Sequence, residues 1–174
     1  FRINNIWSYW IKSEFNAFKN KTVKAIAIDS SSVTRRFFDE MTDFAKTELG
    51  MKGLAWIKIN EDSTIVGPIA KYLSEEVQKE MLEKTGAKEN YGIFFIADEY
   101  LKACKDAGNV RNELGKRLGL IDENVYKFCF IVDFPFYEET DDGKIDFGHN
   151  PFSMPQGGLE ALENKNPLDI LAYQ

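Results

Sequence analysis

The sequence has few of the side chains from which proteins build metal sites and nucleophilic catalytic sites. Of its 174 residues, only Cys104 and Cys129 are cysteines and only His149 is a histidine. Both cysteines lie in apolar periodic segments, as is typical of reduced thiols in a cytoplasmic protein core. One histidine and two separated cysteines cannot assemble a zinc site or a cysteine–histidine pair. We therefore expect no metal site and no disulfide.

Long apolar runs and phosphate-binding glycine loops are also missing. No apolar stretch approaches the ~20 residues that span a membrane, and no signal peptide is visible. The segment Gly50-Met-Lys-Gly53 lacks the spacing of a dinucleotide-binding or P-loop motif. We therefore expect no membrane association and no nucleotide site within residues 22–122.

Positive charge is in short supply as well. The net charge is −6 and the isoelectric point is about 5.0, which argues against a chain that grips nucleic acid by bulk electrostatics. Any RNA contact would come from short patches such as Lys19-Asn-Lys21 or Lys116-Arg117. We interpret both patches as solvated surface, and we expect no DNA binding.

What the sequence does contain is a regular alternation of apolar patterns. Strands are predicted over residues 22–28, 54–60 and 91–97, and helices over residues 34–49, 69–85 and 98–119. The order strand, helix, strand, helix, strand, helix indicates an α+β fold, a mainly antiparallel sheet covered by helices on one face. Residues 1–20 place apolar side chains at helical spacing and are expected to form a packing surface.

Several residues predict where the helices begin, end and face the core. Ser74 before Glu75 and Glu76 marks a start for the second helix, and Gly86 marks its end. Asp98 is expected to cap the third helix. The inner face of that helix is predicted from its apolar spacing to contain Leu101, Cys104, Ala107, Leu114 and Leu118.

The last third of the chain predicts a hairpin and a loop. Residues 128–132 are an unbroken apolar run, typical of a strand buried on both faces, and Pro135 requires that strand to stop or to lie on an edge. Residues 138–143 read as an acidic turn, after which residues 144–147 return as a second strand. The loop that follows contains His149 and Asn150 and is stiffened by Pro151 and Pro155.

Local pattern alone leaves the role of His149 open between two interpretations. A lone imidazole beside an amide and a glycine at a strand end can form a small-ligand site. The alternative, which the local pattern favours, is a loop histidine that only hydrogen-bonds the backbone. Asp133 and Glu138 are interpreted as strand-end and turn residues rather than as an acid–base pair.

Four segments, in order along the chain, together resemble bacterial-type aspartyl-tRNA synthetases. The family pattern contains an aromatic-Val-Asp-Phe-Pro strand followed by His-His-Pro-Phe-Thr-x-Pro. The first three matching segments are Gly50-Met-Lys-Gly-Leu-Ala-Trp-Ile-Lys-Ile-Asn60, Gly92-Ile-Phe-Phe-Ile-Ala-Asp98 and Leu114-Gly-Lys-Arg-Leu-Gly-Leu120. The fourth consists of Phe130-Ile-Val-Asp-Phe-Pro-Phe-Tyr-Glu138 and, after an acidic insert, His149-Asn-Pro-Phe-Ser-Met-Pro155.

The resemblance implies a domain organisation and an activity. Residues 1–21 would be a lead-in segment, and residues 22–123 an α+β insertion module shared with a subunit of glutamyl-tRNA amidotransferase. Residues 124–174 would be part of the antiparallel catalytic sheet of a class II synthetase. The family enzyme is a ligase that activates L-aspartate with ATP and Mg²⁺ and transfers it to tRNA(Asp), in some members also to tRNA(Asn). A homodimer is implied for the whole protein.

By the same resemblance, His149 would contact the substrate aspartate, because an imidazole that is partly protonated can pair with a carboxylate. Asn150 departs from the family's second histidine, so the role of that position is not carried over. The sequence lacks the arginine-rich motif that binds ATP, the Gly-x-Asp-Arg motif, the Gln-Ser-Pro-Gln loop and the anticodon-binding barrel. We therefore expect a segment of a longer protein, with no catalytic residues within it and no activity alone.

Two other functions remain as alternatives. One is a non-catalytic module for tRNA recognition in the amidotransferase subunit, which has no reason to carry the His149 loop directly after the module. The other is an independent acidic protein-interaction domain without a link to tRNA, which the four ordered matches disfavour.

Overall fold

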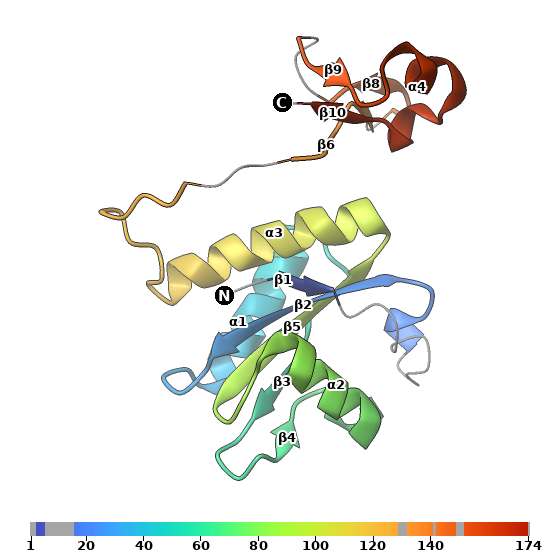
Figure 1. The fold of residues 1–174 in the computed structure, drawn as a ribbon. Coiled ribbons are helices and arrows are strands. Elements are labelled where there is room, and N and C mark those ends of the chain that lie inside the picture. Colours follow the sequence, from blue (N-terminus) through green and yellow to red (C-terminus); the bar gives the residue numbers. More distant parts are fainter. Residues whose placement is uncertain (1–2, 6–15, 129–131, 141, 149–151, 174) are drawn as a thin grey trace. The chain divides into compact units, whose positions relative to one another are not determined.

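Figure 1 shows the computed structural model, which describes residues 3–5, 16–128, 132–140, 142–148 and 152–173. The chain divides into two units, Phe1–Asp122 and Glu123–Gln174, and each is described by itself. The elements of the first unit are β1 (Ile3–Asn5), η2 (Asn16–Phe18), β2 (Thr22–Asp29), α1 (Arg35–Thr47), β3 (Ala55–Ile59), β4 (Ile65–Val66), η3 (Ala70–Tyr72), α2 (Glu75–Thr85), β5 (Tyr91–Asp98) and α3 (Tyr100–Arg117).

The first unit is built around the antiparallel pair β2 and β5. The two strands pair over their whole length, from Thr22 opposite Asp98 to Asp29 opposite Tyr91. The sheet has the order β1-β2-β5-β3-β4, and all of its neighbouring strands are antiparallel. The predicted α+β class with an antiparallel sheet is confirmed.

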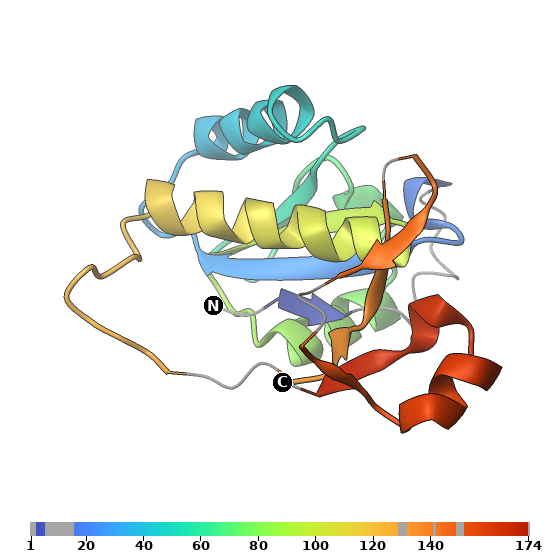
Figure 2. The same cartoon turned by 90° about the horizontal axis from the view of Figure 1, so that it is seen from above.

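Helices cover both faces of this sheet, so the prediction of helices on one face is wrong. In β5, Phe94 and Ile96 contact the core beneath α1 and α3, whereas Ile93 and Phe95 contact the core beneath α2. Figure 2 shows α1 and α3 on one side of the sheet and α2 on the other. The reason is that β5 is apolar on both faces, so both faces must be covered by helices to be shielded from water.

The helix boundaries follow local capping chemistry. The Ser74 hydroxyl accepts a hydrogen bond from the Val77 N–H at 3.4 Å, and Gly86 ends α2 with a φ of 65°. This confirms the predicted start and end of α2. The helix predicted over residues 34–49 is α1, whose buried Phe38 stacks on Trp56 at 4.6 Å and on Phe94 at 5.2 Å between ring centres. Trp56 is therefore buried as well.

The third helix buries Ala107 and Leu114 as predicted, but two other residues of the predicted inner face do not face the core. Leu101 is 67% exposed and Cys104 is half-buried, so the inner face predicted for them is wrong. The apolar side chains that α3 buries are spaced by three or four residues and are Ala103, Ala107, Val110 and Leu114. The N-cap is Glu99 rather than Asp98, which ends β5 and accepts a hydrogen bond from the Glu99 N–H.

The N-terminal residues differ from the expected helical pattern. Ile3–Asn5 forms β1, which pairs antiparallel with β2. The helical conformation indicated by the spacing is therefore wrong for these three residues, because they form a strand that extends the sheet. Residues 6–15, which contain the rest of that pattern, lie outside the described residues.

The second unit contains two small sheets, one helix and one 3-10 turn in its described part. A three-stranded sheet has the order β6-β10-β9, and β7 and β8 form a separate two-stranded hairpin. Among its described residues, the buried apolar cluster is small and consists of Phe136, Ile170 and Ala172. The elements are β6 (Phe134–Pro135), β7 (Tyr137–Glu139), β8 (Ile145–Phe147), β9 (Met154–Pro155), α4 (Gly158–Asn164), η4 (Pro167–Asp169) and β10 (Leu171–Tyr173).

The returning strand predicted over residues 144–147 is confirmed as β8, but its partner is β7, part of which was predicted to be turn, and the buried strand predicted over residues 128–132 is wrong at both described ends. Phe128 is 97% exposed and Val132 is 70% exposed, and neither lies in a strand. A strand buried on both faces needs neighbouring layers that the described part of this small unit lacks. Residues 129–131, with Cys129, lie outside the described residues. No described helix in either unit is long and apolar enough to cross a membrane.

Candidate functional site

The loop that was predicted to contain His149 begins at Gly148, whose backbone packs closely against Pro135 and Phe136. The Gly148 N–H donates to the Phe136 carbonyl at 3.1 Å. A Cβ on Gly148 would lie 3.1 Å from the Pro135 carbonyl oxygen, which is closer than most side chains tolerate. The glycine therefore lets β8 turn into the loop against β6 and β7. His149 and Asn150 themselves lie outside the described residues, as does Pro151.

The far end of the loop is anchored on the central strand of the three-stranded sheet. Pro155 in β9 pairs with Ala172 in β10, and Pro135 in β6 pairs with Leu171 on the opposite side of β10. Both prolines lie on edge strands, where the absence of an N–H leaves no ladder bond unmade. The structure therefore holds both ends of the loop on one small framework.

Gln156 ties this framework together. Its side-chain amide Nε2 donates to Asp133 Oδ1 at 3.0 Å and to the Ala172 carbonyl at 3.2 Å. Its backbone N–H donates to the Leu171 carbonyl at 2.8 Å. Asp133 has a φ of 58°, so it turns the chain into β6 while its carboxylate accepts from Gln156. No local sequence pattern indicates this contact, because the two residues are 23 positions apart.

Asp133 and Glu138 are not brought together as an acid–base pair. Glu138 lies in β7 opposite Asp146 and is exposed, whereas Asp133 contacts Gln156. Hydrogen bonds from Lys144 and Thr140 lower the pKa of Asp142, which closes the hairpin turn. Among the described residues, no group of three or more histidine, cysteine or acidic side chains could hold a metal ion.

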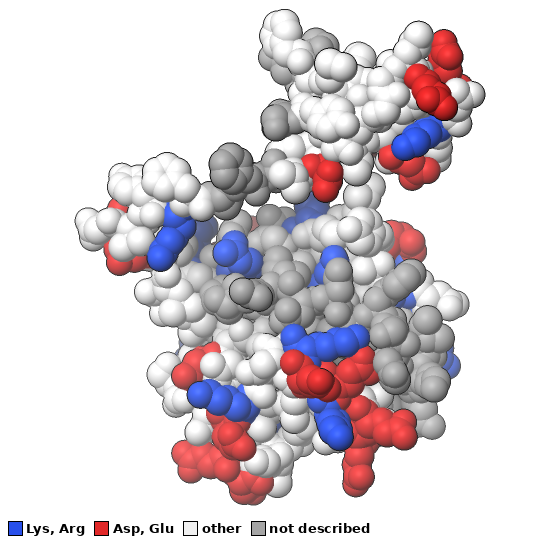
Figure 3. Space-filling view, in the orientation of Figure 1, with Lys and Arg blue, Asp and Glu red and all other residues white. Residues whose placement is uncertain are grey.

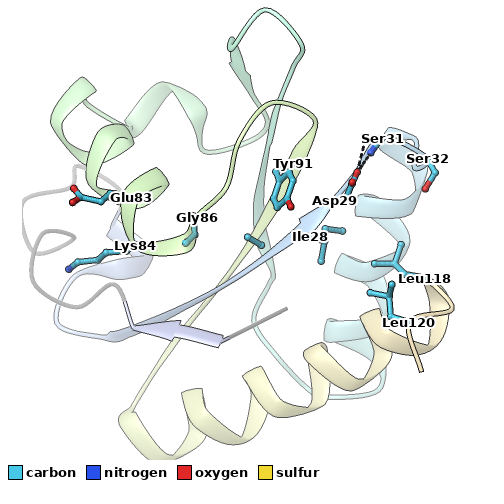
Figure 4. A pocket seen from close by; sticks show the side chains of 12 residues that line it. Ile28, Asp29, Ser31, Ser32, Glu83, Lys84, Gly86, Tyr91, Leu118 and Leu120 are labelled. Carbon is cyan, nitrogen blue, oxygen red and sulfur yellow. Dashed lines mark hydrogen bonds between the residues drawn. The ribbon is translucent and has the colours of Figure 1, made fainter. Parts of the chain in front are cut away.

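A pocket of about 840 Å³ lies in the first unit where β2 ends and β5 begins. Figure 4 shows Asp29 hydrogen-bonded to Ser31 close to Tyr91, with Glu83 and Lys84 of α2 on the opposite side of the drawn residues. Hydrogen bonds from the Ser31 hydroxyl (2.6 Å) and N–H (2.9 Å) lower the pKa of Asp29. This carboxylate is already satisfied by its own turn, so Asp29 is not a free catalytic base.

A second pocket of about 760 Å³ in the same unit is lined by lysines from separate segments. On the face drawn in Figure 3, the described acidic and basic side chains of this unit are interspersed. The lysines of this pocket instead converge on one hollow, and they are Lys19, Lys21, Lys46, Lys52 and Lys71. Only Lys19 and Lys21 lie in a patch that the sequence singled out, because the other three come from distant segments.

The other patch named from the sequence, Lys116-Arg117, makes contacts of its own. The Arg117 guanidinium pairs with Glu113 at 2.7 Å and lies 5.5 Å from the centre of the Phe44 ring. Arg117 is therefore held against its own helix and α1 rather than presented as a free cation.

The chain is similar to one domain family and to several known proteins. The sequence profile of the family described as "GAD domain" matches residues 11–107. An aspartate–tRNA ligase of Streptomyces avermitilis is 52% identical over 164 residues, which is 93% of this chain and 28% of that protein. An aspartate–tRNA(Asp/Asn) ligase of the Wolbachia endosymbiont of Brugia malayi is 46% identical over 99% of this chain and 30% of its own length. The chain thus spans less than a third of these relatives.

Proposed function

Since this chain belongs to the GAD domain family, we propose that it is the segment of an aspartate–tRNA ligase that joins a GAD domain to part of the catalytic domain. The predicted resemblance is confirmed by the relatives, which match over nearly the whole chain under that name. The observation that carries the proposal is that this match continues through the second unit, beyond the 11–107 range of the GAD domain.

The whole protein would act in two steps. The aspartate α-carboxylate attacks the α-phosphate of ATP and releases pyrophosphate, which gives an aspartyl adenylate. The terminal ribose hydroxyl of the tRNA then attacks the activated carbonyl and releases AMP. Mg²⁺ would offset the charge of the phosphates in the first step. The residues that bind ATP and Mg²⁺ lie in other parts of the protein, so this chain alone would be inactive. A cytoplasmic homodimer completes the proposal.

Within this chain, His149 would contact the side-chain carboxylate of aspartate, and Asn150 would be its neighbour. The structure supports this role because the two flanks of the loop are both held: Gly148 donates to the Phe136 carbonyl, and Pro155 in β9 pairs with Ala172 in β10. A site held on paired strands keeps its geometry better than one on a free loop. A partly protonated imidazole attracts a carboxylate.

Aspartate-dependent exchange between ATP and pyrophosphate tests the proposal. We compare the full-length protein, its His149→Ala variant and the 174-residue chain. The full-length protein should exchange, the variant should show a raised KM for aspartate, and the chain should be silent. A full-length protein that does not exchange refutes the ligase, and an unchanged variant refutes the role of His149.

A non-catalytic role in tRNA recognition within an amidotransferase subunit is the second candidate. The GAD domain match alone would allow it, because that match ends at residue 107. The continued similarity through Glu123–Gln174 favours the ligase.

A further inference from the structure

The acidic net charge of the chain is not shared by its two units. Residues 1–122 contain 19 lysines and arginines against 18 acidic residues, whereas residues 123–174 contain three against ten. The excess of negative charge therefore belongs to the second unit. The first unit taken by itself is close to neutral, so it does not repel a polyanion as an acidic chain would.

Five lysines of the first unit line one groove. This groove is the pocket of about 760 Å³ at the end of the sheet where β2 and β3 begin and β5 ends, and we call it the lysine groove. It is lined by lysines from four segments, namely the turn after η2, α1, the loop before β3 and η3. Convergence of like charges from distant segments is costly unless a counter-charge binds there.

The acidic side chains that line the lysine groove pair mainly with residues outside its lining. Asp98 and Asp106 pair with Lys102, at 3.5 Å and 2.5 Å, and Lys102 is not among the lining residues. Asp39 lies 3.9 Å from Arg35 on its own helix. Among the described residues, Lys21 is the one groove lysine that pairs with a lining carboxylate, that of Asp98, at 3.6 Å, and it lies closer to Glu99, at 2.6 Å.

The remaining lysines are available for a ligand. Within the described part of the chain, the side chains of Lys19, Lys46 and Lys52 make no ion pair. All three are exposed. The Lys71 ammonium lies 4.9 Å from the centre of the Tyr72 ring, so the groove also has an aromatic wall. Lysines beside an aromatic ring are typical of surfaces that follow a nucleic-acid strand.

We propose that the lysine groove binds the phosphodiester backbone of RNA. Identification of that RNA as the tRNA substrate rests on the proposed function. Lysine is a compact charge on a flexible stem, so it contacts phosphates without reading bases. The groove positions the RNA, and selection among tRNAs is left to other parts of the protein.

The first experiment measures binding to the 174-residue chain by fluorescence anisotropy, with a labelled transcript of an aspartate tRNA as the probe. The test variant is K46Q/K52Q, and the matched control is K79Q/K105Q, which removes two exposed lysines outside the groove. Each lost phosphate contact should lower the slope of log K against log salt by about 1. We expect the test variant to bind about tenfold or more weakly at 0.1 M salt, and the control to bind like wild type.

Thermal unfolding curves of both variants verify that they fold. Equal RNA affinity of the two double variants overturns the proposal, and so does an absence of RNA binding by the wild-type chain. Poly-glutamate serves as the competing polyanion. If the chain binds poly-glutamate through Lys46 and Lys52 but not RNA, the groove docks an acidic protein and the proposal is wrong.

The second experiment separates this proposal from the proposed function. In the full-length protein, K46Q/K52Q should raise the KM for tRNA in aminoacylation by about tenfold, while aspartate-dependent exchange, which needs no tRNA, stays unchanged. If the K46Q/K52Q variant keeps its aspartate-dependent exchange and its KM for tRNA is unchanged, RNA binding by the lysine groove is refuted and the ligase function is not. A wild-type protein without exchange refutes the ligase, whatever the RNA affinity of the groove.

Discussion

At the scale of single residues, the caps of α1 and α2 offer a matched pair of substitutions. Ser74 accepts a hydrogen bond from the Val77 N–H, whereas Thr34, the N-cap of α1, makes no side-chain capping bond. Ser74→Ala should therefore lower the free energy of unfolding by about 1 kcal/mol, and Thr34→Ala should lower it much less. Urea unfolding followed by circular dichroism measures both. Equal losses would show that the Ser74 hydroxyl does not cap α2.

The carboxylate of Asp98 predicts how stability depends on pH. Burial raises the pKa of Asp98, but the hydrogen bond from the Glu99 N–H and the charges of Lys102 and Lys21 outweigh it, so the pKa is lowered overall. A group whose pKa is lower in the folded state stabilises the protein above its unfolded pKa, about 3.9, and loses this effect as pH falls through the folded value.

Asp98→Asn should lower the Tm by about 1 to 3 °C at pH 7, as expected for a partly exposed ion-pair network in a domain of this size. The difference from wild type should shrink below pH 4. Differential scanning calorimetry at pH 7 and pH 3 tests this. Asp43→Asn, which removes an exposed carboxylate that makes no ion pair among the described residues, is the control. A difference that persists undiminished at pH 3 contradicts the assignment.

At the scale of elements, the close packing of β5 against α1 makes one glycine irreplaceable. A Cβ on Gly92 would lie 2.6 Å from the ring of Phe38, which is fully buried between Trp56 and Phe94. Gly92→Ala should therefore destabilise the protein by about 1 to 3 kcal/mol, because the ring cannot move away. Chemical denaturation measures the loss.

Gly108 is the control for this substitution. It lies within α3, and a Cβ there would meet nothing within 4 Å. Gly108→Ala should stabilise the protein by about 0.5 to 1 kcal/mol, because alanine loses less backbone entropy in a helix. If both alanines shift stability in the same direction, the contact between Gly92 and Phe38 does not limit the packing.

The elements also show how far the sequence alone could lead. Short-range signals worked: Ser74 and Gly86 bounded α2 correctly, and the turn at Gly143 lies where it was predicted. Predictions that required knowledge of the surroundings failed. Leu101 has the polarity of a core residue but lies on the outer side of α3, because the packing of the whole sheet decides which side faces inward.

The candidate site shows the same limit. The sequence named the loop of His149, but it could not show that Gln156 reaches Asp133 across the three-stranded sheet. It also treated Lys19-Asn-Lys21 as solvated surface, because a patch read along the chain does not reveal partners that come from other segments. Lys46, Lys52 and Lys71 join that patch only when the sheet and α1 are assembled.

At the scale of the whole molecule, the two units should differ in stability. Among the described residues, the first unit buries two apolar clusters of 13 residues each, whereas the second buries one cluster, of Phe136, Ile170 and Ala172. A small unit with so little buried apolar surface opens at low cost in free energy when it is not supported by other structure. The longer relatives contain sequence on which such support could depend.

Hydrogen exchange followed by mass spectrometry measures this difference in the 174-residue chain. Amides of β2 and β5 should exchange only through global unfolding of the first unit, whereas those of β7, β8 and β10 should exchange faster by at least two orders of magnitude. In the full-length protein the second group should become slow, because the second unit would then be part of a larger catalytic sheet. Equally slow exchange of β10 and β5 in the chain alone would show that Glu123–Gln174 is stable by itself and would contradict its description as part of a larger domain.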